Sequence, residues 1–191
     1  MSITVFNSIT LDGVMQAPGR PDEDTRGGFA HGGWAAGYQD EVSMQFAGEG
    51  MSSGGGLLFG HRTYADLLDV WTHADENPFT EVLTRSQKYV VSRSHDTVLA
   101  YPESTLLAGE ASDTVATLRE RHPGDLVILG SGELVRSLHA AGLIDRYILL
   151  IHPIVLGSGT RLFDGGERAD LVLERSVPTS TGVIIAQYAR G

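Results

Sequence analysis

The sequence predicts an α/β fold with a mostly parallel central sheet and an antiparallel C-terminal hairpin. Short apolar runs alternate with segments of helical periodicity through most of the 191 residues, as in βαβ units. Segment 125–129 (DLVIL) is almost wholly apolar, which is typical of a strand buried on both faces of a parallel sheet. The last two runs, 171–177 and 182–189, have only a Pro-Thr-Ser-Thr turn between them, which favours a terminal hairpin.

The elements of the first half follow from periodicity and turn residues. Asp40 is a suitable N-cap for a helix that continues to about Ala47. Segment 16–37, between the first predicted strand and this helix, is rich in glycine, proline and acidic residues, and loops of this length usually cover or line a binding site. We expect strands at 3–9, 57–59 and 88–92, and helices at 40–47 and from 63 or 66 to 71.

The second half repeats the alternation of strands and helices. Pro123 ends one predicted helix, and Gly142 occupies the C-terminal cap position of the next. We expect strands at 98–99, 105–107, 125–129 and 146–151, an extended segment at 153–156, and helices at 113–122 and 132–141. No repeat or change in composition divides the chain, so residues 1–191 are predicted to form a single domain.

Composition excludes several functional classes. The formal charge of −10, with no run of basic residues, argues against a nucleic-acid-binding protein. No stretch approaches the roughly 18 apolar residues that a membrane-spanning helix needs. The absence of cysteine excludes disulfides and thiolate metal sites, and the scattered histidines predict no metal centre. No signal peptide is recognised at the N-terminus, so a cytoplasmic location is expected.

Three predicted strands end in small, turn-forming residues. These ends are Gly60–Thr63, Ser92–Arg93 and Gly130–Gly132. In an open α/β sheet, ligands bind outside the carboxyl ends of the strands, where glycines and helix N-termini accept phosphate groups. A glycine after a strand is more often simply a tight turn, but three such ends together favour a phosphorylated ligand. Arg62 and Arg93 suggest an additional phosphate, and hence NADP rather than NAD.

Two other patterns allow different interpretations. Residues 50–54 match G-x-S-x-G, but a helix is predicted before Ser52 and a strand after it, which is the reverse of a nucleophile elbow. A serine hydrolase is therefore a minor alternative. Trp34 lies among glycines and alanines, where it either stacks on a planar ligand or anchors the long loop to the core.

Several segments resemble the dihydrofolate-reductase-like superfamily. They are SITLDG, LLFGHRTY, KYVVSR, LVILGSGELVRSL and LIDRYILLIHPIVLGSGTRLF. Together they are most similar to the reductase domain of the bifunctional riboflavin-biosynthesis deaminase/reductase. The resemblance covers nearly the whole chain, whereas the cysteine-containing zinc motif of the deaminase half is not in this sequence. It implies a three-layer dihydrofolate-reductase-like fold, with helices on both faces of the sheet and NADPH across the strand ends.

The resemblance also implies roles for individual residues. Asp40 is the candidate substrate-side acid and proton donor, and Asp12 is a second catalytic candidate at the start of the loop that closes over the nicotinamide. Trp34, Asp40 and Glu41 are the candidate substrate-binding residues. The implied cofactor-binding residues lie in strand one, the long loop and the three strand-end turns: Ser8, Met15, Gly60, His61, Arg62, Thr63, Ser92, Arg93, Gly130, Ser131, Gly132 and Leu134.

The expected activity is hydride transfer from NADPH to a C=N or C=O bond. The substrate class is a small pterin-, pyrimidine- or ribosylamino-pyrimidine-like molecule, as for 5-amino-6-(5-phosphoribosylamino)uracil reductase. A carboxylic acid that donates the proton near pH 7 would need a pKa raised by burial. The alternative is a nucleotide-binding homologue without turnover. The resemblance also implies a homodimer, because an exposed edge strand needs to be covered.

Overall fold

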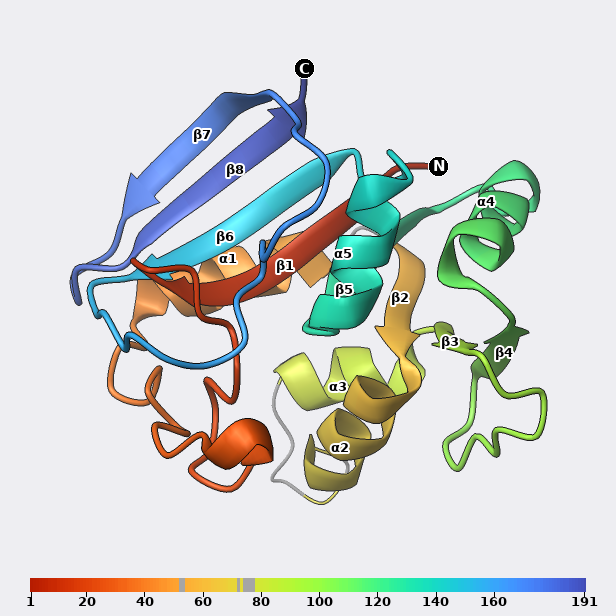
Figure 1. The fold of residues 1–191 in the computed structure, drawn as a ribbon, viewed down its shortest axis with the longest axis horizontal. Helices are drawn as coiled ribbons and strands as arrows, with labels where there is room; N and C mark the ends of the chain where they lie inside the picture. The colour runs from red at the N-terminus through yellow and green to blue at the C-terminus, as the bar shows by residue number, and fades with distance from the viewer. Residues whose placement is uncertain (52–53, 72, 74–77) are drawn as a thin grey trace.

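The central element of the computed structural model is an eight-stranded sheet with the order β4-β3-β2-β5-β1-β6-β8-β7 (Figure 1). The structure describes residues 1–51, 54–71, 73 and 78–191. Strands β1 to β6 are parallel wherever they pair, and β8 runs antiparallel to both β6 and β7. The strands are β1 (Ile3–Thr10), β2 (Gly54–Gly60), β3 (Lys88–Ser92), β4 (Ser104–Ala108), β5 (Asp125–Leu129), β6 (Arg146–His152), β7 (Leu171–Pro178) and β8 (Ile184–Arg190).

Helices cover both faces of the sheet, which confirms the predicted three-layer fold. The helices are α1 (Glu41–Met51), α2 (His61–Trp71), α3 (Pro78–Arg85), α4 (Ala111–Arg121) and α5 (Gly132–Ala140), with a short 3-10 turn, η1 (Arg26–Gly28). Val115 of α4 and Leu134 of α5 join the apolar cluster on one face of the sheet. Phe46 of α1 packs on the opposite face, beneath β6 and β8, and Figure 1 shows α5 in front of the sheet and α1 behind it.

Alternation along the strands determines which residues meet each helical layer. In β1, Ile3 and Val5 face α4 and α5, whereas Phe6 packs toward α1. In β6, Ile148 and Leu150 belong to the cluster with Phe46, so the next side chain on that face is His152. Because β1 to β6 are parallel, their carboxyl ends lie at one edge of the sheet. The segment between β1 and α1 lies at this edge (Figure 1).

Two local differences separate the observed elements from those the sequence predicts. Residues 98–99 form no strand. Helix α3 was not predicted, although its first residue is Pro78, and proline is favoured at the first helical position. Leu83 of this short helix is fully buried, with Val82 packed against the same cluster. Its two turns give too few repeats for a periodicity that stands out in the sequence.

Candidate cofactor and substrate site

Two of the three strand-end turns are in direct contact. Strands β2 and β5 are neighbours in the sheet, so their carboxyl ends are adjacent. The backbone N–H of Gly60 donates a 3.0 Å hydrogen bond to the side-chain oxygen of Ser131. A Cβ atom on Gly130 would lie 3.1 Å from the methyl carbon of Thr63. The turns after β2 and β5 therefore form one continuous surface at the start of α2 and α5.

The turn before α5 has the geometry of a phosphate-binding helix N-terminus. Gly130 and Ser131 both adopt left-handed backbone conformations, with φ of 60° at each, and for serine this is an uncommon conformation. The Ser131 side chain makes no cap hydrogen bond to the first turn of α5. The N–H groups of that turn thus keep their capacity to bind an anion, which the helix dipole favours. Leu134 lies in this first stretch of α5 and is buried against the core.

Gly132 and Met15 lie against each other at this turn. A Cβ atom on Gly132 would lie 2.7 Å from the Met15 sulfur, so a residue with a side chain would have to displace the methionine. Asn7 of β1 also contacts that sulfur, at 3.9 Å. The predicted cofactor residues Met15, Gly130, Ser131 and Gly132 are thereby brought together, and the lack of a Cβ atom at position 132 makes room for the Met15 side chain.

The third turn, Ser92–Arg93 after β3, lies at the same edge of the sheet, but Arg93 forms an ion pair with Glu110. Strands β2 and β3 pair in register, with Gly60 opposite Val91. The Ser92 hydroxyl contacts that of Thr97 at 2.7 Å. The Nε atom of Arg93 lies 3.1 Å from Glu110, and both side chains are exposed. Arg62 is also exposed, in the first turn of α2. The two arginines therefore follow adjacent strands, as predicted, with Arg93 held by an exposed carboxylate.

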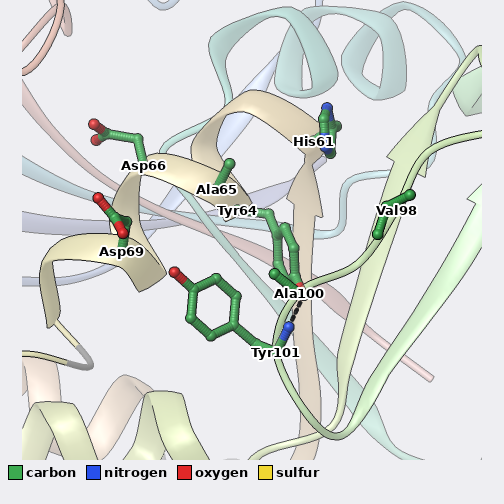
Figure 2. A pocket seen from close by; sticks show the side chains of 8 residues that line it. All are labelled: His61, Tyr64, Ala65, Asp66, Asp69, Val98, Ala100 and Tyr101. Carbon is green, nitrogen blue, oxygen red and sulfur yellow. Dashed lines mark hydrogen bonds between the residues drawn. The ribbon is translucent and has the colours of Figure 1, made fainter.

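A shallow cavity of about 380 Å³ lies beside α2 (Figure 2). Of the predicted cofactor residues it includes His61, and Asp66 and Asp69 contribute carboxylates. Tyr64 accepts a 3.0 Å hydrogen bond from the backbone N–H of Tyr101 across it. Two carboxylates make this cavity unsuitable for phosphate groups. The phosphate-binding geometry is therefore at the Gly60 and Gly130 turns rather than in this cavity.

Asp12 fixes the base of the long loop. Its carboxylate accepts hydrogen bonds from the Thr10 hydroxyl at 2.6 Å and from the Gly157 N–H at 2.8 Å. It also lies 3.6 Å from the Arg161 guanidinium. The hydrogen bond from Thr10 is the largest cause of a pKa lowered to about 2. These contacts favour the charged form of Asp12 and hold the base of the loop, and a catalytic role for Asp12 stays a prediction.

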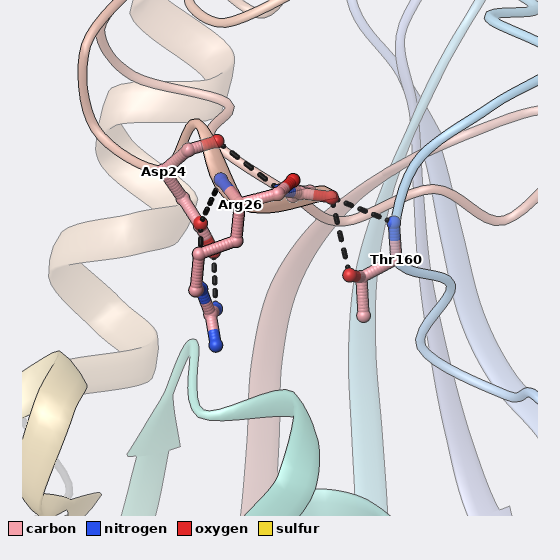
Figure 3. A network of polar contacts seen from close by, with 4 residues as sticks. Asp24, Arg26 and Thr160 are labelled. Atoms are coloured by element: carbon pink, nitrogen blue, oxygen red, sulfur yellow. Dashed lines mark hydrogen bonds and ion pairs between the residues drawn. The ribbon is translucent and has the colours of Figure 1, made fainter. Parts of the chain in front are cut away.

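Gln16 connects the long loop to the segment after β6 (Figure 3). Its side-chain oxygen accepts hydrogen bonds from the N–H of Thr160 at 2.9 Å and from its hydroxyl at 3.1 Å. Its side-chain N–H donates to the carbonyls of Asp24 and Arg26, at 3.1 and 3.0 Å. Arg26 in turn forms an ion pair with Asp24, and the charge of Glu133 in the first turn of α5 also acts on it. The sequence analysis did not identify Gln16 or Arg26.

Asp40 is a helix cap rather than a proton donor. One carboxylate oxygen accepts the N–H of Ser43 at 2.8 Å, and the other accepts both the N–H and the hydroxyl of Ser180 at 2.7 Å. These hydrogen bonds, that from Ser43 first, lower the pKa of Asp40 to about 2. The raised pKa that proton donation near pH 7 would need is not found at Asp40, since donors stabilise the charged form here. Glu41 begins α1 and is exposed.

Trp34 anchors the long loop to the end of β6. Its side chain is 8% exposed, and its indole N–H donates a 2.7 Å hydrogen bond to the Gln16 carbonyl. Its ring packs edge-on against His152, with centroids 5.1 Å apart. The loop-anchor interpretation thus describes the structure. Ser8, which lies opposite Leu150 in the sheet, is half-buried nearby on the face covered by α1.

The residues that the structure describes contain neither a candidate metal centre nor a membrane-spanning helix. Within these ranges, no group of three or more histidine, aspartate or glutamate residues is arranged to hold a metal ion. Across the same ranges, no helix combines the length and apolar character needed to span a membrane. The candidate site therefore consists of the strand-end turns, the long loop and the end of β6. Ser52 of the G-x-S-x-G match lies outside the described residues.

Comparison with protein families decides how this geometry is classified. A family model described as the RibD C-terminal domain matches residues 1–185. The chain belongs to this family. RibD C-terminal domains are reductase-type domains, so the resemblance recognised in the sequence is confirmed. The structure has the fold that this resemblance implies, and membership of the family indicates an oxidoreductase.

This RibD-type chain has relatives in sequence and in fold. It is 28% identical over 138 residues to the uncharacterized protein YyaP of Bacillus subtilis, covering 69% of this chain and 72% of the relative. A putative riboflavin biosynthesis protein from Shewanella sp. PV-4 superposes with a TM-score of 0.76 at 20% identity, covering 100% of this chain and 99% of the other. Dihydrofolate reductase from Enterococcus faecalis, solved with NADP(H), gives 0.65 at 13% identity, covering 100% and 96%.

Proposed function

We propose that this chain is an NADPH-dependent reductase that transfers hydride to a C=N or C=O bond of a small pterin-, pyrimidine- or ribosylamino-pyrimidine-like substrate. The observation that carries the proposal is the contact between the Gly60 turn and Ser131, which joins two strand ends to the N-terminus of α5. Such a surface suits a diphosphate, because N–H groups and the helix dipole favour its charge. Membership of the RibD C-terminal domain family supports the same chemistry.

Different strand ends would bind different parts of the cofactor. The Gly130–Gly132 turn and the first turn of α5 would hold the diphosphate, while Gly60 and Thr63 support that turn from β2. Arg62 and Arg93, with Ser92, would bind the phosphate on the adenosine side. Ser8 and Met15 would lie against the nicotinamide, which supplies the hydride when bound. The long loop would position the substrate and exclude water.

We expect NADPH to bind at least tenfold more tightly than NADH, because the additional phosphate gains charge-assisted contacts with arginine. Titration of each nucleotide, followed by its fluorescence, measures both dissociation constants. Arg62→Ala and Arg93→Ala should each weaken NADPH binding about tenfold and leave NADH binding unchanged. A chain that binds neither nucleotide below about 1 mM would contradict the proposal.

Arg168→Ala provides the matched control for the two arginine variants. Arg168 is exposed and pairs with Asp170 at 3.0 Å, much as Arg93 pairs with Glu110, but it lies far along the chain from the strand-end turns. This variant should bind NADPH as the wild type does. If all three variants lose the same affinity, the effect is one of overall charge and not of a phosphate site.

A nucleotide-binding homologue without turnover is the second candidate. It is favoured by the low pKa of both Asp12 and Asp40, since neither carboxylate has a proton to give near pH 7. Oxidation of NADPH, followed by absorbance with dihydrofolate and with 5-amino-6-(5-phosphoribosylamino)uracil, separates the two candidates. Tight NADPH binding with no oxidation on either compound would favour the binding protein.

We also propose that the protein is a homodimer formed through the hairpin of β7 and β8. Strand β7 is at the edge of the sheet, and Val172, Leu173 and Ile184 on the hairpin are about half exposed. An edge strand with apolar side chains is stabilised when another chain covers it. Light scattering should give twice the mass of one chain for the wild type. For the Val172→Lys variant it should give the mass of a single chain. A monomeric wild type at micromolar concentration would exclude this interface.

A further inference from the structure

His152 is a buried polar side chain without a hydrogen-bonding partner. It is the last residue of β6, and its side chain is 4% exposed. Neither of its ring nitrogens has a hydrogen-bond partner among the residues that the structure describes. Most buried polar side chains in proteins are hydrogen-bonded, so such an exception calls for an explanation.

Aromatic rings from the long loop cover this histidine. Trp34 packs edge-on at 5.1 Å between centroids, and Tyr38 packs edge-on at 5.3 Å. The two preceding residues on the same face of β6 are Ile148 and Leu150, which are apolar. A phenylalanine at position 152 would fill nearly the same volume and leave no polar atom unpaired. Packing alone therefore does not account for an imidazole here.

The position of His152 places it beside the proposed hydride-transfer site. It lies at the carboxyl end of β6, opposite Thr10 in the register of β1. Ser8, the residue proposed to lie against the nicotinamide, is opposite Leu150 on the same face. Of the two rings over His152, that of Trp34 is fixed by its bond to Gln16, whereas Tyr38 is only half-buried. Displacement of the Tyr38 ring would therefore uncover the side of the imidazole that it now covers.

We propose that His152 is a substrate-recognition residue that forms a hydrogen bond, through one ring nitrogen, with a planar pyrimidine or pterin ring in the place where the Tyr38 ring now lies. The proposal rests on the proposed reductase function and names the part of the substrate that the site recognises. The two nitrogens of a neutral imidazole point to opposite sides of the ring, so one of them pairs with a single N–H or C=O group of the heterocycle. Burial lowers the pKa of His152 to about 4, so the ring carries one donor and one acceptor near pH 7.

Calorimetry with a uracil ligand tests this assignment. The probe is 5-amino-6-(ribitylamino)uracil, titrated into the full chain saturated with NADP⁺, with NADP⁺ binding measured on the same samples. His152→Phe should weaken probe binding about tenfold and leave NADP⁺ binding unchanged, because it removes two hydrogen-bonding atoms and keeps the volume. His152→Gln keeps a donor and an acceptor, so it should bind the probe within about threefold of the wild type.

A second readout separates recognition from a merely structural role. In protein labelled with ¹⁵N-histidine, the NMR signals of the His152 ring nitrogens should shift when the probe is added. They should keep their positions in samples of wild-type or Tyr38→Phe protein to which no probe is added. His95→Phe is the control, because His95 is exposed in the loop after β3. It should change neither probe binding nor melting temperature, whereas His152→Phe should raise the melting temperature by removing unpaired polar atoms.

The outcomes distinguish this inference from the function on which it rests. If NADP⁺ binds and His152→Phe binds the probe as well as the wild type does, His152 is not a recognition residue, and the reductase proposal stands. The same conclusion follows if the wild type binds NADP⁺ but not the probe at about 1 mM. If neither ligand binds, both proposals fail.

Discussion

Gly132→Asp should abolish NADPH binding in a chain that still folds, with the Met15 side chain displaced from its place beside residue 132. Residue 132 is the first residue of α5, where a carboxylate interacts favourably with the helix dipole, by roughly 0.5 kcal/mol. The same carboxylate would lie where the proposed diphosphate approaches the helix. Like charges about 4 Å apart repel by about 4 kcal/mol near a protein surface, and half of that already weakens binding about thirtyfold. Fluorescence titration with NADPH and urea unfolding measure the two effects.

Ser137→Asp is the matched control for this charge. Ser137 is exposed on the same helix, further from its N-terminus, and the substitution adds the same negative charge. It should leave NADPH binding within about twofold of the wild type, because screening by salt is strong for an exposed and more distant charge. If Gly132→Asp binds NADPH normally, the N-terminus of α5 is not the diphosphate site. If it unfolds the chain, displacement of Met15 costs more than the dipole contributes.

The strand pattern and the strand-end turns were predictable because their causes are local. A strand buried on both faces, such as β5, needs consecutive apolar residues, and the sequence displays them directly. Gly130 and Gly132 mark a place where the chain turns sharply into a helix and where a side chain would collide with a neighbour. Since β2 lies between β3 and β5 in the parallel part of the sheet, the three carboxyl ends lie at one edge, and the contact between Gly60 and Ser131 joins those of β2 and β5.

The roles of the acids were not predictable, because they depend on partners far along the chain. Asp40 accepts hydrogen bonds from Ser180, which is 140 residues away, and Asp12 accepts one from Gly157. The sequence shows a carboxylate before a helix or after a strand, but not the donors that the fold brings to it. The same limit applies to His152, the last residue of β6. Its unpaired nitrogens become evident only once Trp34 and Tyr38 are placed over it.

Acid should destabilise the protein in two separate pH ranges that belong to different residues. His152 has a pKa of about 4 in the folded chain and about 6.5 when unfolded, so protons bind the unfolded state first. Stability is complete above pH 6.5 and falls by about 3 kcal/mol as the pH decreases to 4. Asp12, with a pKa lowered from 3.8 to about 2, contributes roughly 2 kcal/mol that is complete above pH 4 and lost toward pH 2. Asp40 acts in the same direction in this lower range.

A variant at each position should change one of the two ranges. His152→Phe should give a free energy of unfolding that is nearly constant from pH 6.5 to 4 and still falls below pH 4. Asp12→Asn should lose about 2 kcal/mol at pH 7, because a neutral amide cannot replace the carboxylate toward Gly157 and Arg161, and should reduce the fall in the lower range to the part that belongs to Asp40. Urea titrations at closely spaced pH values measure both profiles, with His95→Phe as the control for a histidine in solvent. A wild-type profile that is flat between pH 6.5 and 4 would mean that the His152 imidazole finds a partner in solution, so that burial alone no longer sets its charge.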